Sequence, residues 1–145
     1  MSAENLGSHT LLESIRAIAA AQGVSLAAPT QIAYLYWTSQ AVHSVDVPAP
    51  PTGYRNRLLF FFGQQFATSN TNFHVRADNA TGTILFRLGR VPISSFKPVF
   101  WRPPCANFLP NNGLAFNVQC PSIGGTTGGA LIFGWTVEPD PTYSP

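Results

Sequence analysis

Charged side chains are scarce in this chain. Asp, Glu, Lys and Arg together make up 10% of the residues, whereas an ordinary soluble domain has about 25%. Between Arg102 and Glu138 the sequence contains none of the four. Because a free monomer normally relies on surface charge for its solubility, this scarcity predicts that neighbouring subunits cover much of the surface and that the chain belongs to a larger assembly.

Clusters of basic residues and long apolar runs are also absent. The formal net charge is +2, and the bases, all arginine except Lys97, are scattered along the chain. Surfaces that bind nucleic acid or anionic lipid usually show a basic run, so we expect no nucleic-acid partner. No apolar run approaches the ~18 residues that cross a bilayer, and MSAENLGSHT lacks the features of a secretory signal, so we expect no membrane partner.

Motifs that bind metals or cofactors are missing. Cys105 and Cys120 have no His or Cys at metal-binding spacing around them, so we interpret them as reduced thiols, with a disulfide between them as the alternative. There is no zinc or calcium motif. The glycine-rich segment IGGTTGG lacks the Lys-Ser/Thr of a phosphate loop. We therefore expect no metal and no cofactor.

Catalytic residue types occur only in poor geometry. His43 and Asp46 lie an odd number of positions apart in an expected strand, so their side chains point to opposite faces. His74 and Asp78 could share a face, but no third partner is evident. Asp46 and Asp78 are also the only carboxylates in the expected β-rich body, where a glycosidase would need a pair about 5 to 10 Å apart. We predict no catalytic residue and no enzymatic activity.

A short amphipathic helix is expected over residues 10–22. Its first turn, TLLE, has the form of a capping box, and Gly23 suits the residue that ends a helix. Leu11, Ile15 and Ile18 follow helical spacing and form one apolar stripe. This stripe either packs on the chain's own β-rich body or docks onto a neighbouring subunit, and the sequence leaves both alternatives open.

From residue 31 the period of hydrophobicity changes to two, which is typical of strands. Gly63 is expected to end one strand, and Pro98 places another at a sheet edge. The absence of alternating long helices predicts an all-β fold, an antiparallel, jelly-roll-like β-sandwich of roughly seven or eight strands. The expected units are a helical arm with its connector (1–28), a β-sandwich domain (29–139) and a C-terminal tail (140–145).

The expected strands cover residues 32–37, 41–47, 57–62, 73–77, 84–88, 96–101, 114–120 and 130–137. The run RLLFFF within them is typical of a strand buried on both faces, because it lacks polar residues at alternate positions after its arginine.

Aromatic residues are abundant where charge is scarce, with 11 Phe. The Tyr and Trp residues have two interpretations: a stacking platform for a glycan, or the filling of the core and of seams between subunits. We favour the core and the seams, and we keep glycan binding as the alternative function. The residues concerned are Tyr34, Tyr36, Trp37, Tyr54, Trp101 and Trp135.

The body from Gly53 to Val137 resembles small β-sandwich structural proteins of tailed bacteriophages. The matching segments are RNRLLFFFGQQF, TSNTNFHVRADNATGTIL, PVFWRPPCANF, NNGLAFNVQ and GALIFGWTVEP. Proteins of this kind decorate or cement capsids, or serve as tail and connector subunits. The resemblance implies a non-enzymatic virion protein, made in the host cytoplasm, that binds the major capsid protein or other virion subunits. It also implies a homo-oligomer, with a trimer favoured.

No residue role carries over from this resemblance, because such proteins act through surfaces. The helix stripe would supply apolar contacts. Arginines would supply forked hydrogen bonds to carboxylates of a partner at the rim of an interface. The candidate interface residues are Leu11, Ile15, Ile18, Arg57, Arg87, Trp101 and Arg102.

Overall fold

The computed structural model describes residues 14, 15, 17, 18, 30–38, 41–66, 71–91, 98–103, 113–120 and 128–145. Within these residues no helix is long and apolar enough to span a bilayer. Ser14, Ile15, Ala17 and Ile18 are helical. The strands are β1 (Gln31–Trp37), β2 (His43–Val47), β3 (Tyr54–Phe66), β4 (Thr71–Ala77), β5 (Ile84–Val91), β6 (Val99–Trp101), β7 (Phe116–Cys120) and β8 (Gly128–Pro139).

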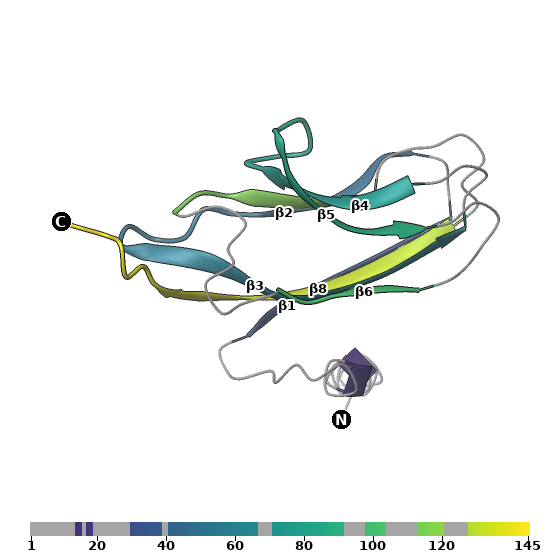
Figure 1. Cartoon of the computed structure of the whole chain (residues 1–145), viewed down its shortest axis with the longest axis horizontal. Helices are drawn as coiled ribbons and strands as arrows, with labels where there is room; N and C mark the ends of the chain where they lie inside the picture. Colours follow the sequence, from purple (N-terminus) through teal and green to yellow (C-terminus); the bar gives the residue numbers. More distant parts are fainter. Residues whose placement is uncertain are drawn as a thin grey trace, which may run out of the picture.

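The strands form two four-stranded antiparallel sheets that face each other (Figure 1). The first sheet has the order β1-β8-β3-β6, and the second has the order β2-β7-β4-β5. The chain therefore crosses repeatedly between the sheets, which is the double Greek-key path of an eight-stranded jelly roll. This confirms the all-β sandwich expected from the sequence. It also confirms the edge position expected near Pro98, because β6 ends the first sheet.

The inner faces of the two sheets enclose one hydrophobic core. Phe61 and Phe133 reach into it from the first sheet, while Phe73 and Phe116 reach into it from the second, and all four are fully buried. The rings of Phe61 and Phe73 lie 4.9 Å apart, and those of Phe116 and Phe133 lie 6.2 Å apart, both in tilted geometry. Such aromatic pairs add to the free energy of simple area burial, so they bind the two sheets to each other.

Strand β3 continues through Gly63, where the sequence predicted its end. A Cβ atom at this position would lie 2.5 Å from the Phe61 ring and 2.7 Å from the Phe73 ring. The glycine therefore makes room for two aromatic rings of the core and does not end the strand. This is the close-approach role of glycine within a strand.

The prediction that β3 is buried on both faces is confirmed. Leu58 and Phe61 belong to the inner core, whereas Leu59, Phe60 and Phe62 belong to a second hydrophobic cluster. The register of β3 against β8 shifts between Leu58 and Phe60. This irregularity is a bulge, and a bulge allows two successive residues to take the same side of the sheet.

All residues of strand β7 are buried, including its two polar ones. The turn between β4 and β5 lies over its outer side. Arg76 Nε donates to Gln119 Oε1 (2.6 Å), Arg76 Nη1 donates to the Gly82 carbonyl (2.7 Å), and Gln119 Nε2 donates to the Ala80 carbonyl (3.1 Å). The side chain of Gln119 is thus buried in a hydrogen-bonded network, as burial of polar groups requires.

Candidate interaction surface

Part of the side of the first sheet that faces away from the second sheet is apolar. The outer side of an antiparallel sheet is commonly polar, but here it holds a separate hydrophobic cluster in which Phe60 of β3 and Ile132 of β8 are buried. Ile132 pairs with Phe62 on one side and with Tyr34 of β1 on the other. We call this set the outer cluster; it comprises Ile15, Ile32, Leu59, Phe60, Phe62, Phe100 and Ile132.

The N-terminal helix covers part of the outer cluster. In Figure 1 its described residues lie beyond the first sheet, on the side opposite the second sheet. Ile15 is only 2% exposed and packs in the same cluster as Phe60 and Ile132, whereas Ser14 and Ala17 are exposed. Of the two alternatives left open by the sequence, these contacts correspond to packing on the chain's own body. Leu11 lies outside the described residues.

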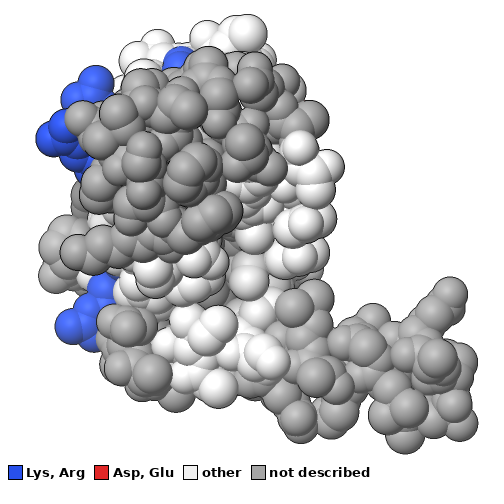
Figure 2. All heavy atoms as spheres, turned by 90° about the vertical axis from the view of Figure 1, so that its right-hand side faces the viewer, with Lys and Arg blue, Asp and Glu red and all other residues white. Residues whose placement is uncertain are grey.

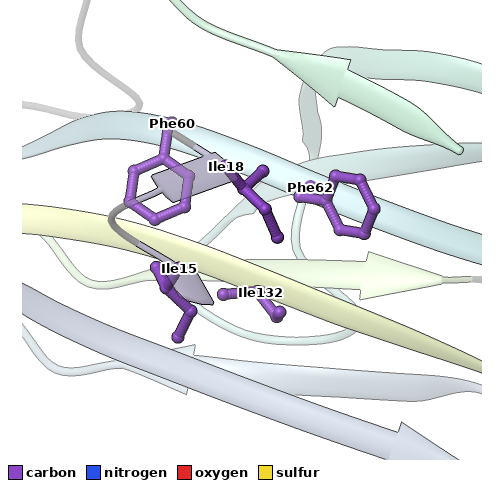
Figure 3. Close-up of a pocket in the computed structure, with 5 residues that line it drawn as sticks. All are labelled: Ile15, Ile18, Phe60, Phe62 and Ile132. Atoms are coloured by element: carbon purple, nitrogen blue, oxygen red, sulfur yellow. The ribbon is translucent and has the colours of Figure 1, made fainter. Parts of the chain in front are cut away.

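A hollow remains between the helix and the sheet. Figure 3 shows Ile15 and Ile18 from the helix facing Phe60, Phe62 and Ile132 from the sheet. The space among these side chains amounts to about 140 Å³, part of which is open solvent, and it is too narrow to hold a water molecule. The hollow is therefore a seam between two packed elements, and it offers no room for a small-molecule ligand.

Two tyrosines extend the apolar side toward the sheet edge. Tyr34 and Tyr36 lie on β1, an edge strand of the first sheet, and are 47% and 62% exposed. Since they are two positions apart, their rings lie on the same face. Tyr54 is also exposed. These tyrosines were among the aromatics assigned to the core or to seams, and the structure places them at the surface.

The tryptophans serve the core. Trp37 is buried and its ring stacks on His43 at 4.7 Å. Trp101, which was a candidate interface residue, is half-buried and stacks on Phe86 at 5.3 Å. Trp135 is half-buried against the core as well. The sequence could not show that the tryptophans pack in the core while the tyrosines are exposed, because both residue types occur at the same strand-like spacing.

The candidate arginines divide between two places. Arg57 Nη1 lies 3.6 Å from Glu138 Oε2, and Arg55 donates from Nε and Nη2 to Glu138 Oε1 at 2.9 and 2.7 Å. Arg57 is therefore close to a carboxylate of its own chain. Arg87 on β5 and Arg102 just after β6 are exposed.

The strands that carry Arg87 and Arg102 adjoin each other along one side of the sandwich. Figure 2 shows basic side chains along one side of the molecule and no acidic side chain in view on that face. Arg87 and Arg102 therefore belong to neighbouring segments at the edges of the two sheets.

The residues considered for catalysis do not assemble. His43 stacks on Trp37, while the Asp46 carboxylate accepts a 2.8 Å hydrogen bond from Asn117 Nδ2 on the other side of the sheet. Asp78 is exposed, lies beyond the end of β4 and has a φ of 62°, so it does not share a strand face with His74. Among the described residues, no three or more His, Cys, Asp or Glu side chains are grouped so that they could hold a metal ion.

The described cysteine is a poor nucleophile. Burial raises the pKa of the Cys120 thiol to about 12, against a smaller lowering effect of its hydrogen bond with Gln65. A thiol reacts as its thiolate, so this side chain acts as a small core residue. Cys105 lies outside the described residues, and the state of the pair stays a prediction.

The surroundings of the His74 side chain predict how the stability of the protein depends on pH. Burial lowers the pKa of His74 below its ordinary value of 6.5, and the positive charges of Arg76 and Arg87 lower it further. As the pH falls below 6.5, His74 takes up a proton more readily in the unfolded chain than in the folded chain. The free energy of unfolding therefore decreases as the pH falls from 6.5 to the lower pKa that His74 has in the folded protein. We expect thermal melts between pH 8 and 5 to show a smaller loss below pH 6.5 for His74→Gln than for the original protein. Parallel curves for the two proteins would contradict this assignment.

The chain has few detectable relatives in sequence. No family model matches it, and no curated protein sequence matches it. Two crystal structures of the Tobacco streak virus coat protein align with 83% of this chain at 12% identity, covering 96% and 93% of the coat protein chains, with TM-scores of 0.35 and 0.38. A structure of the infectious bursal disease virus Gx strain aligns with 78% of this chain and 42% of its own chain, at 8% identity and a TM-score of 0.17. These TM-scores all lie below 0.5, so the likenesses carry no argument about function.

Proposed function

We propose that this chain is a non-enzymatic structural protein of a virus particle that acts through contacts between subunits. The observation that carries the proposal is the strand order, with β1-β8-β3-β6 facing β2-β7-β4-β5. The eight-stranded jelly roll is a fold of viral capsid domains, and also of lectins and cupins. The fold alone does not separate these classes, so the properties of the surface are needed to choose among them.

The surface favours an assembly role. Only 10% of the residues are charged, and the outer cluster together with Tyr34 and Tyr36 gives one side of the first sheet an apolar character. Contiguous apolar patches with polar surroundings mark interaction sites. Exposed sheet edges in a chain with little charge also favour cover by neighbouring subunits, because uncovered edges invite aggregation.

Within the virion, the specific proposal is decoration of the shell. The chain would bind the major capsid protein as a small homo-oligomer, with a trimer favoured, and a tail or connector subunit is the alternative position. Scattered bases argue against a genome-binding role, since such roles use basic runs. Arg87 and Arg102 would anchor carboxylates of the partner, and residues 1–28 would act as an arm ahead of the sandwich at 29–139 and the tail at 140–145.

Glycan binding is the second candidate function. The observation that favours it is the pair of exposed rings, Tyr34 and Tyr36, on one face of an edge strand. Aromatic rings of this kind present an apolar face beside a polar hydroxyl. A glycan array probed with the original protein and with Tyr36→Ala separates this function from the structural one.

The virion role is tested on particles of the virus that encodes the chain. We expect the protein to co-sediment with purified particles, and we expect the double variant Arg87→Glu, Arg102→Glu to bind at least tenfold more weakly, because both anchors would then repel a carboxylate. The exposed variant Thr83→Ala serves as the matched control and should bind like the original protein. Absence of the chain from particles, together with glycan binding that Tyr36→Ala abolishes, would transfer the function to the second candidate.

A further inference from the structure

We propose that the sheet residues of the outer cluster form an acceptor site for an amphipathic helix, and that in the oligomer this helix is the N-terminal segment of a second copy of the chain. Within one isolated chain, the chain's own segment occupies the site. The inference deepens the proposed function, since exchange of the segment would link subunits of the assembly. It commits to a second copy of this chain as the partner.

The acceptor is built from two central strands of the first sheet. Phe60 of β3 pairs with Gly134 of β8, and a Cβ atom at Gly134 would lie 2.3 Å from the Phe60 ring. The ring therefore lies flat across β8, where any side chain at position 134 would displace it. Ile132 lies two positions before Gly134 on β8 and pairs with Phe62 of β3. These residues give the sheet an apolar floor, which suits a helix that presents an apolar stripe.

The donor has the complementary pattern. Ile15 and Ile18 are three positions apart and face the sheet, whereas Ser14 and Ala17 are exposed. Residues at this spacing lie on one face of a helix. The described part of the helix thus offers two apolar anchors beside two exposed small residues, and it needs only a floor such as the one around Phe60.

The connector is long enough for the helix to bind the acceptor site of its own chain or that of a second copy. Residues 19–29, AAAQGVSLAAP, separate Ile18 from Thr30 next to β1. A chain of this length spans up to roughly 35–40 Å when extended, whereas a small domain is about 30 Å across. The same contact can therefore form within one subunit or between two, and exchange of an identical element is a low-cost route to an oligomer.

The chemistry of the site points to this chain as the source of the helix. The outer cluster contains no charged residue, which matches Ile15 and Ile18 of the chain's own helix, the two side chains that line the hollow with the sheet. Each copy supplies one acceptor and one donor, and a head-to-tail exchange with this stoichiometry can close into a ring, such as the proposed trimer.

The test is a cross-link between differently tagged copies. One copy carries Ile18→Cys and the other carries Phe62→Cys, both in a Cys105→Ser background, since both positions line the same hollow and Cys120 is buried. After co-expression and mild oxidation of the purified oligomer, we expect a disulfide between the two tags. Pairing Ile18→Cys with Arg90→Cys, an exposed position on β5 of the other sheet, should give none.

A second measurement keeps the proposal falsifiable if a cysteine variant folds poorly. By light scattering at high micromolar concentration we expect an oligomer for the original protein, a monomer for Ile15→Asp, and an oligomer for the exposed control Ser14→Asp. A monomeric original protein overturns the exchange, and so does an oligomer that Ile15→Asp leaves intact or in which the two differently tagged copies form no disulfide. These assays need no virus particle. A cross-link without particle binding would therefore reject the virion role and leave the exchange standing.

Discussion

Replacing Phe61 with alanine is expected to lower the free energy of unfolding by about 3 to 5 kcal/mol. Phe61 is fully buried, and its ring packs on Phe73 from the opposite sheet at 4.9 Å. The substitution removes this contact between the sheets and leaves a cavity that the core can fill only in part. Because domains are stable by about 5–15 kcal/mol in total, much of the stability would be lost, and denaturant unfolding measures it directly.

Two further variants calibrate this result. Phe116→Ala should cost a similar amount, since Phe116 is equally buried and packs on Phe133 across the sandwich. Leu114→Ala is the matched control, because Leu114 is 47% exposed and precedes β7, and its effect should stay within about 0.5 kcal/mol. A Phe61→Ala effect as small as that of Leu114→Ala would mean that the two sheets do not share this core.

Replacing Glu138 with glutamine is expected to lower the free energy of unfolding by about 2 kcal/mol, because a buried charge loses its partner. Arg55 is 8% exposed and directs two nitrogens at Glu138 Oε1, so loss of the negative charge leaves a buried guanidinium without its counter-ion. Removing one partner of a fully buried pair costs more. The side chain of Glu138 is 25% exposed, so solvent screening reduces the effect.

Asp78→Asn is the matched control for Glu138→Gln, because it removes the same charge from an exposed turn. Asn tolerates the positive φ of this position as well as Asp does, so its unfolding free energy should change by less than about 0.5 kcal/mol. If both variants unfold at the same denaturant concentration, the Arg55–Glu138 pair contributes nothing to stability.

The strands were largely predictable because their hydrophobic pattern is local. The run IAYLYW corresponds to β1, and the run ALIFGWTV lies within β8. Strand ends were harder to predict, since they depend on partners distant in sequence. Strand β3 extends well beyond the expected 57–62 because β8 pairs along its whole length, and Gly63 stays within it because two aromatic rings need the space.

The interaction surface was predictable in part. The helix stripe gave Ile15 and Ile18 as interface residues, but the sequence could not say which surface they meet. Phe60 and Ile132 were missed as the floor of that surface. The run RLLFFF predicted burial on both faces of its strand, but the pattern does not say which element covers the outer face. Asn117 and Gln119 of β7 were missed for a different reason, since their polarity concealed burial beneath a distant turn.

Because strand β3 is covered on both faces, fewer substitutions are tolerated in it during evolution than in a strand with one exposed face. In an ordinary sandwich strand, every second position faces water and accepts most polar substitutions, as Asp46 of the exposed side of β2 illustrates. Between Leu58 and Phe62 both sides of the strand face apolar neighbours, so a polar replacement at the buried positions Leu58, Phe60 and Phe61 buries an unpaired group. We therefore expect this segment to be the least variable stretch among natural variants of the protein.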